Sequence, residues 1–394
     1  MQIFNTFFKY LSRKTSNNTF IPEIDGLRFI AIITVLFFHL NTVLIRSVDG
    51  GFEQEILKET YADFGWWMIR LDLGVKVFFA ISGFVLALPF IKSYDLKKPI
   101  NLKSYFIRRV TRLEPPFLIS LIVLFIGQLL LLKQDLSTLW LNFLASLVYM
   151  HGFIFGEPSK INPVTWSLET EFQFYILMPL FMWFLFKNKG LTFSVMGLVA
   201  CSLLAYFSKS AIINFDVKFL SHSLLVHLGN FLTGILFALI YYKVPNWIKK
   251  KHLVYDLIGF IGLFLLFKYY KPQAYIMNSI VFNIAILLLF TGVFKGILLN
   301  YIFTRKFIYT IGGMCYSIYL IHYVILHMAV PLTLVFTSGM GYKFQLLVQS
   351  FIHVPIVLLI SIIFFVLFER PFMDKDFFKK WVKSISNQSI IKHD

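Results

Sequence analysis

Eleven apolar stretches, each about as long as a membrane-spanning helix, follow one another along this chain and limit what it can fold into. A helix needs roughly 20 mostly apolar residues to cross the hydrocarbon core of a bilayer. Of the 394 residues, 58% are hydrophobic and 14% are charged, whereas soluble domains carry about 25% charged residues. A soluble enzyme, a disordered tail and a fibrous protein are thereby excluded. The stretches lie near residues 27–46, 71–91, 113–132, 137–155, 165–186, 191–208, 220–242, 253–270, 274–294, 307–332 and 344–369.

The distribution of basic residues indicates the direction of these spans. Eleven crossings would put the two termini on opposite sides of the membrane. If residues 137–155 dip into the membrane or lie at its surface instead, the cytoplasmic segments carry 25 Lys and Arg and the outside segments carry 10. Cytoplasmic loops are enriched in basic residues, so this asymmetry favours the second arrangement. We therefore predict an all-α polytopic membrane protein with about ten transmembrane helices, one short re-entrant or interfacial helix, and both termini in the cytoplasm.

The predicted organisation along the chain has three parts. Residues 1–20 are expected to form a cytoplasmic N-terminal segment, residues 21–371 a single transmembrane domain, and residues 372–394 a basic cytoplasmic tail. A cleaved signal peptide is not expected, because no uninterrupted apolar region precedes a small-residue cleavage site. The net charge of +17 mostly reflects topology, so no nucleic-acid partner is expected. Cys201 and Cys315 lie in apolar runs and form neither a disulfide framework nor a zinc motif, and no metal site is expected.

Two ionisable residues in the first span form the clearest candidate site. Arg28 and His39 are eleven positions apart, about 20° beyond three full helical turns, so they share one face roughly 16 Å apart along the axis. Arg28 lies at the predicted cytoplasmic mouth, and His39 lies past the midplane toward the outside. Each alone has a plainer explanation, as a snorkelling arginine or a buried, hydrogen-bonded histidine. Together they indicate function, because ionisable residues inside a membrane are costly.

A second candidate cluster is basic. The segment "FIRRVTRLEPP" places Arg108, Arg109 and Arg112 before the third span, in the predicted cytoplasmic layer. Arg109 and Arg112 are three positions apart and share a helical face. Topology alone accounts for such charge, but a phosphate clamp accounts for it equally well, because arginine offers planar, bidentate donors to phosphate.

A third cluster lies in "INPVTWSLETEFQFYILMPL", at the predicted outer start of a span. Glu171 and Tyr175 share a helical face, Glu169 lies beside them, and Trp166 occupies the interfacial position typical of tryptophan. Carboxylates at a helix N-terminus also stabilise the helix itself, which is the alternative role for both. The weaker candidates for lining a pore or binding an acceptor are polar residues in other spans: Ser82, Tyr316, Ser317 and His322.

In this order, the motifs resemble those of the acyltransferase-3 family of integral membrane acyltransferases, from about Ile24 to Pro371. The most diagnostic is "DGLR" opening the first span with an R-x10-H spacing. "FFAISGF", an R-x-x-R followed by proline, "WSLETEFQFY", "YSIYLIH" and a terminal E-x-P complete the set. Two positions depart from the family pattern. Lys76 stands where many members carry Asp, so no role transfers to it, and Glu169 stands where many carry a small residue, so the family carboxylate is Glu171.

The resemblance implies transfer of an acyl group, usually acetyl, from cytoplasmic acyl-coenzyme A to a hydroxyl of a cell-surface or secreted glycan, or less often of a small molecule. It implies a protein of the bacterial inner membrane whose partners are the lipid bilayer, the acyl-coenzyme A donor and the hydroxyl acceptor, with no tightly bound cofactor. Some members carry an additional extracytoplasmic esterase-like domain, which is not expected in this sequence.

The resemblance and the motifs together suggest roles for the candidate residues. Arg109 and Arg112, with Arg108, would hold the coenzyme A phosphates while Arg28 positions the donor. His39 would act as general base or as transient acyl carrier. The third cluster's family carboxylate would orient the histidine or bind the acceptor.

A transporter or flippase for a lipid-linked saccharide is the alternative hypothesis, since buried charge and a basic rim would serve it too. Transporters often contain internal repeats with broken spans near the midplane. The two halves of this sequence show no convincing repeat, so the enzyme hypothesis is favoured.

Overall fold

The computed structural model is helical throughout the residues that it describes, with no strand among them. These are residues 10–13, 20–48, 64–131, 133, 135–187, 203, 207, 220, 222–270 and 276–374. The all-α prediction is therefore confirmed for these residues. All but residues 203 and 207 of the predicted span 191–208, and the greater part of the terminal segments 1–20 and 372–394, fall outside them.

Seven helices in the described ranges are long and apolar enough to cross a membrane. They are Pro22–Ser47, Phe64–Asp95, Leu102–Leu130, Leu224–Lys243, Met277–Lys295, Cys315–Thr337 and Tyr342–Glu369. A chain with this many apolar helices is an integral membrane protein, and the count of about ten spans stays a prediction. The stretch 137–155 forms two short helices of 12 and 5 residues, and neither is long enough to cross a bilayer alone.

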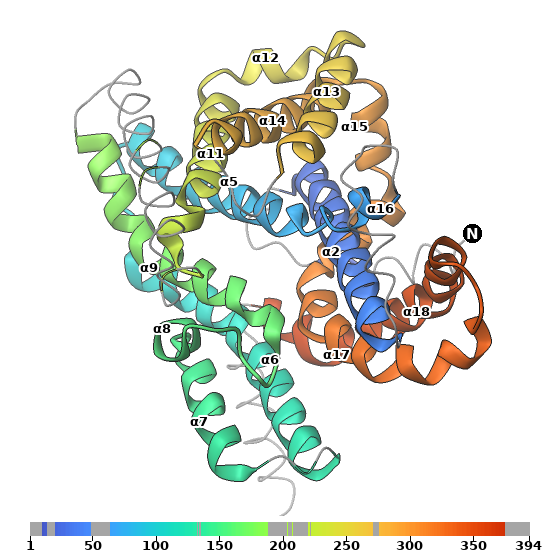
Figure 1. Ribbon diagram of the computed structural model, residues 1–394. Helices are drawn as coiled ribbons and strands as arrows, with labels where there is room; N and C mark the ends of the chain where they lie inside the picture. The colour runs from blue at the N-terminus through green and yellow to red at the C-terminus, as the bar shows by residue number, and fades with distance from the viewer. Residues whose placement is uncertain are drawn as a thin grey trace, which may run out of the picture.

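The helices pack as a bundle around α2 and α5 (Figure 1). In chain order they are α2 (Pro22–Ser47), α4 (Phe64–Met68), α5 (Leu73–Asp95), α6 (Leu102–Leu131), α7 (Leu136–Leu147), α8 (His151–Phe155), α9 (Trp166–Lys187), α11 (Leu224–Lys243), α12 (Pro245–Lys249), α13 (Val254–Tyr269), α14 (Ile276–Lys295), α15 (Leu298–Phe303), α16 (Lys306–Gly313), α17 (Cys315–Thr333) and α18 (Tyr342–Phe364). Helix α2 contacts α5, α16 and α17, while α5 also packs along α11 and α17 along α18. Helix α18 continues into the π-helical turn η4 (Phe365–Glu369), and the 3₁₀ turn η1 (Pro163–Thr165) precedes α9.

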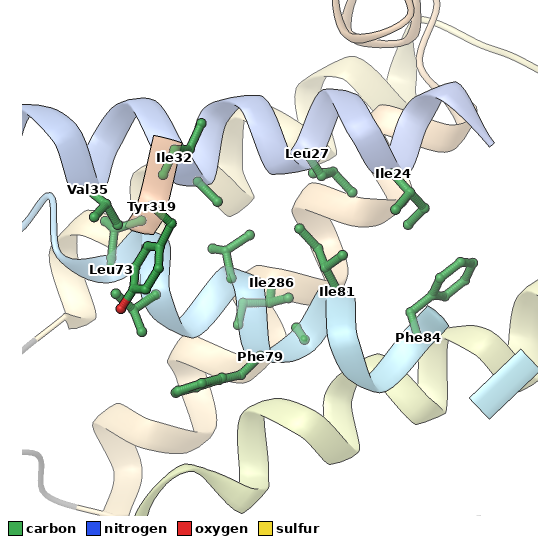
Figure 2. Packing of buried hydrophobic residues seen from close by; sticks show 14 of the residues in the cluster. Ile24, Leu27, Ile32, Val35, Leu73, Phe79, Ile81, Phe84, Ile286 and Tyr319 are labelled. Carbon is green, nitrogen blue, oxygen red and sulfur yellow. The ribbon is translucent and has the colours of Figure 1, made fainter. Parts of the chain in front are cut away.

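Aliphatic and aromatic side chains between α2, α5 and α11 form the main core. Leu27 and Val35 of α2 are fully buried, with Leu27 above Ile81 and Val35 above Leu73 of α5 (Figure 2). On the other side of α5, the ring of Phe79 stacks on Phe231 of α11 with ring centroids 4.7 Å apart. This packing fixes the faces that α2 and α5 present to the rest of the bundle.

Glycines allow α5 and α11 to approach closely. A Cβ atom built on Gly83 would lie 2.1 Å from the carbonyl oxygen of Phe231, and one on Gly234 would lie 1.8 Å from that of Ala80. Small residues at such interfaces let helix backbones come together in membranes. The glycine of the "FFAISGF" motif therefore has a packing role.

We predict that Gly234→Leu destabilises the fold by about 3 kcal/mol or more, because the added side chain must push two backbones apart. The melting temperature and the gel-filtration profile of the detergent-solubilised protein measure this effect. Gly127→Leu is the matched control, since nothing lies within 4 Å of a Cβ at that position on α6. Equal melting temperatures for the two variants would contradict the packing role.

Candidate functional site

A cavity partly open to solvent lies among α2, α5, α6, α9 and α17. Seven of the residues that the sequence singled out as site candidates line it: Arg28, Ser82, Arg109, Arg112, Glu171, Tyr175 and Tyr316. Four polar or sulfur-bearing residues not singled out as site candidates line it as well: Arg13, Ser167, Cys315 and Tyr319. The sequence placed the α6 arginines and the α9 carboxylate in opposite layers of the membrane, but the structure brings them to one cavity.

A contact between α6 and α9 helps to bring these groups together. The hydroxyl of Tyr105, one turn before the α6 arginines, donates to the carbonyl oxygen of Tyr175 on α9 at 3.2 Å. The hydroxyl of Tyr316 at the start of α17 likewise donates to the carbonyl oxygen of Leu113 on α6 at 2.8 Å. Helix α6 is thus joined to both α9 and α17 beside the arginines.

Arginine side chains give the cavity an excess of positive charge. Asp25, three residues before Arg28 in the "DGLR" motif, accepts a close hydrogen bond from Arg28. Arg109 and Arg112 form no ion pair within 4.0 Å with any residue in the described ranges, and each has a buried Nε without a hydrogen-bond partner. Glu369 attracts Arg112 without forming a close ion pair. Cations that lack close counter-ions are costly to bury, so such a cluster suits a bound anion.

Glu171 is the carboxylate that lines this cavity. Its Oε1 accepts close hydrogen bonds from the hydroxyls of Ser82 on α5 and Tyr175 one turn further along α9. These hydroxyls, and not His39, are its hydrogen-bond partners. Glu171 therefore bridges α5 and α9 at the cavity wall, where it can meet a polar group of a bound molecule.

His39 instead forms a pair with His322 of α17. Nδ1 of His39 lies 3.0 Å from Nε2 of His322 and 3.0 Å from the carbonyl oxygen of Val35. Nδ1 of His322 faces two carbonyl oxygens, those of Ile318 at 3.0 Å and Tyr319 at 2.9 Å. A carbonyl oxygen only accepts, so Nδ1 of His322 carries the proton and its Nε2 carries a lone pair.

The tautomer of His39 follows from that of its partner. Because Nε2 of the neutral His322 is an acceptor, the Nδ1–H of His39 donates to it and to the carbonyl oxygen of Val35. Nε2 of the neutral His39 is then unprotonated and available as a base. His39 is half-buried whereas His322 is fully buried, so the accessible nitrogen belongs to His39.

Tyr319 lies between the cavity and the histidine pair. Its side chain lines the cavity, and its ring centroid is 5.8 Å from that of His322. Its hydroxyl donates to the carbonyl oxygen of Val164 and accepts from Ser167 at 2.7 Å. The histidine pair itself does not line the cavity, so a ligand that reaches both must extend past this tyrosine.

Two charged candidates lie outside the cavity. The Nε of Arg108 donates to the carbonyl oxygen of Ser104 on its own helix at 3.0 Å. Glu169 is buried, and its Oε2 accepts from the backbone N–H of Gly152 in α8 at 2.9 Å. The structure therefore separates Arg108 from the two other arginines of α6, and it gives Glu169 a role in joining α8 to α9.

The other two candidates outside the cavity are Trp166 and Ser317. The indole of Trp166 packs against the rings of Phe79 and His227, with centroids 6.2 and 5.3 Å away. The hydroxyl and the backbone N–H of Ser317 both donate to Glu369, at 2.5 and 3.0 Å. The terminal E-x-P motif thus holds the start of α17. Within the described ranges, no group of three or more His, Cys, Asp or Glu is placed to hold a metal ion.

Asp25 and Arg13, two site residues not among the candidates, differ in whether the sequence pattern could have indicated them. Asp25 belongs to the "DGLR" motif and is one helical turn from Arg28, so its pairing was accessible from the spacing. Arg13 lies before the first span, and no local pattern distinguishes it from an ordinary basic residue at the membrane surface.

A family model and known proteins indicate the same relationship for this chain. A family model described as an acyltransferase domain matches residues 21–380. A Staphylococcus aureus (strain COL) protein named "Putative O-acetyltransferase" is 30% identical over 332 residues, which cover 78% of this chain and 51% of that protein. The peptidoglycan O-acetyltransferase OatA of Listeria monocytogenes is 26% identical over 338 residues, 79% of this chain and 50% of its own length. The chain thus spans about half the length of these relatives. No solved structure matches.

Proposed function

This chain belongs to the acyltransferase-3 family, and from that premise we propose that it is a membrane-embedded O-acyltransferase. It would transfer an acyl group, most simply acetyl, from acyl-coenzyme A to a hydroxyl of a glycan at the cell surface. The histidine pair is the observation that carries the proposal, because it leaves one accessible ring nitrogen free to take a proton from a hydroxyl. Transport of an intact saccharide requires no such base.

The arginine-lined cavity is the proposed donor site. Arg109 and Arg112 are half-buried cations, each with a buried Nε that lacks a hydrogen-bond partner, and Arg28, held by Asp25, lines the same cavity. Guanidinium groups bind phosphate with paired, charge-assisted hydrogen bonds. The nucleotide phosphates of acyl-coenzyme A would bind here, and the pantetheine arm is the extended part that would carry the thioester past Tyr319 toward His39.

His39 is the proposed general base. Its Nε2 removes the proton of the acceptor hydroxyl as the oxygen attacks the thioester carbon. The new carbon–oxygen bond forms, the carbon–sulfur bond breaks, and the coenzyme A thiolate leaves and takes up a proton. Nε2 of His322 accepts the Nδ1–H of His39 throughout and stabilises the imidazolium that forms. Transient acylation of the same Nε2 is the variant of this mechanism in which the acyl group moves in two steps.

The relatives suggest the acceptor, and the charge distribution suggests the membrane location and the orientation of the protein. The Listeria relative is named as acting on peptidoglycan, a hydroxyl-rich glycan. The excess of Lys and Arg in alternate loops favours both termini in the cytoplasm and a location in the bacterial inner membrane. The base then lies between a cytoplasmic donor and an external acceptor, which explains why the enzyme is embedded in the bilayer.

We expect the purified protein, reconstituted in vesicles with acetyl-coenzyme A labelled in the acetyl group, to transfer label to added peptidoglycan fragments. The label should appear as an alkali-labile ester, measured by scintillation counting after separation. Protein-free vesicles are the control. A flippase would move a lipid-linked saccharide across the vesicle membrane without labelling it, and that result would replace the enzyme proposal with the transporter alternative.

A further inference from the structure

Arg13 lies outside the acyltransferase domain and still lines the cavity of that domain. The family match begins at residue 21, whereas Arg13 belongs to the short described segment 10–13 before the first span. Its neighbour Leu11 is 4% exposed and belongs to the main hydrophobic core. The segment is therefore docked against the bundle, and Arg13 is held at the cavity by packing as well as by charge.

Asp25, the ion-pair partner of Arg13, is bound more closely by Arg28. The Nη1 of Arg13 lies 3.4 Å from Oδ1 of Asp25, and the same oxygen accepts the much closer hydrogen bond of Arg28. Only 13% of the Arg13 side chain is exposed, so little of its charge is solvated by water. Arg13 thus resembles Arg109 and Arg112, as a buried guanidinium that is not fully neutralised by the protein.

The charge environment agrees with this description. Burial and the nearby positive charges of Arg112 and Arg28 lower the pKa of Arg13 to about 9. The group is still protonated at neutral pH, but its cation is destabilised. An anion placed among these arginines would relieve the repulsion, and an anion with several phosphate groups would relieve it for more than one guanidinium.

We propose that Arg13 is a donor-binding residue that contributes a phosphate contact from outside the matched acyltransferase domain. This role extends the proposed function and depends on it, because the ligand is the nucleotide part of acyl-coenzyme A. Coenzyme A carries a pyrophosphate and a separate phosphate monoester. The two arginines of α6 and Arg13, which come from separate segments and line one cavity, suit such a divided anion, with the α6 pair on one phosphate group and Arg13 on another.

Arg13→Gln tests the proposal while keeping a polar side chain beside Asp25. We expect kcat/KM for acetyl-coenzyme A to fall about tenfold, the loss of one charge-assisted hydrogen bond of about 1.4 kcal/mol. The second substrate is S-acetylpantetheine, which has the same thioester and no phosphate. Its kcat/KM, measurable without saturation, should be unchanged. Arg13→Lys should recover part of the activity with acetyl-coenzyme A.

Arg305→Ala is the matched control, because Arg305 stacks on Tyr301 at 3.5 Å and does not line the cavity. An unchanged kcat/KM for acetyl-coenzyme A in Arg13→Gln would overturn the proposal. An equal loss with both substrates would also overturn it, since that result indicates structural damage. If the unaltered protein neither binds nor uses acetyl-coenzyme A, the proposed function itself fails, which is a distinct outcome.

Discussion

His39→Ala should lower acyl transfer by roughly 1,000-fold while leaving the protein folded and able to bind acetyl-coenzyme A, because general base catalysis contributes about 10²–10⁴-fold. The donor cavity is lined by other residues, so the dissociation constant of the donor should change little. Turnover is measured with the reconstituted protein and labelled acetyl-coenzyme A, and donor binding by calorimetry on the same preparation.

Two further variants sharpen this prediction. His322→Phe removes the acceptor of the His39 Nδ1–H but keeps the base, so an intermediate loss of turnover is expected. His327→Ala is the control, because this histidine on the same helix is exposed and does not contact His39. Full transfer activity in His39→Ala, at equal amounts of inserted protein, would show that another group removes the proton.

The double variant Arg109→Ala and Arg112→Ala should raise the dissociation constant of acetyl-coenzyme A by about 100-fold or more. Hydrogen bonds to charged groups contribute about 1.5–3 kcal/mol each, and each 1.4 kcal/mol is a factor of ten in affinity. Neither side chain forms an ion pair within 4.0 Å of a described residue, and gel filtration of the variant checks that it remains folded. Calorimetric titration of the solubilised protein measures the constant.

Arg108→Ala is the matched control for that variant. Arg108 is adjacent in sequence and has the same charge, but its guanidinium bonds to its own helix and does not line the cavity. The Arg108→Ala variant should bind the donor with the same affinity as the unaltered protein. Equal weakening by Arg108→Ala would mean that diffuse positive charge, and not a geometric clamp, attracts the donor.

Helical periodicity was enough to predict part of this site. The eleven-residue spacing of Arg28 and His39 places them on one face of α2, and the three-residue spacing of Arg109 and Arg112 brings both to the cavity. The same geometry explains why Glu169 and Glu171 have different roles. Residues two positions apart on a helix point in directions about 200° apart, so only one of the two carboxylates faces the cavity.

Contacts between distant parts of the chain were not accessible from the sequence. His322 meets His39 across 283 positions, and only the packing of α17 on α2 makes them a pair. The sequence pattern assigned Glu171 and the α6 arginines to opposite membrane layers, but in the structure they line the same cavity. Arg13 reaches the cavity because its segment docks on the core, which no local pattern indicates.

The most direct test of the account is mass spectrometry of surface glycans from cells that express either the unaltered protein or His39→Ala at equal membrane levels. We expect glycans to gain the mass of an acyl group only with the unaltered protein, and the size of the gain identifies that group. The same gain in cells that express His39→Ala would contradict the central claim that this histidine performs the transfer.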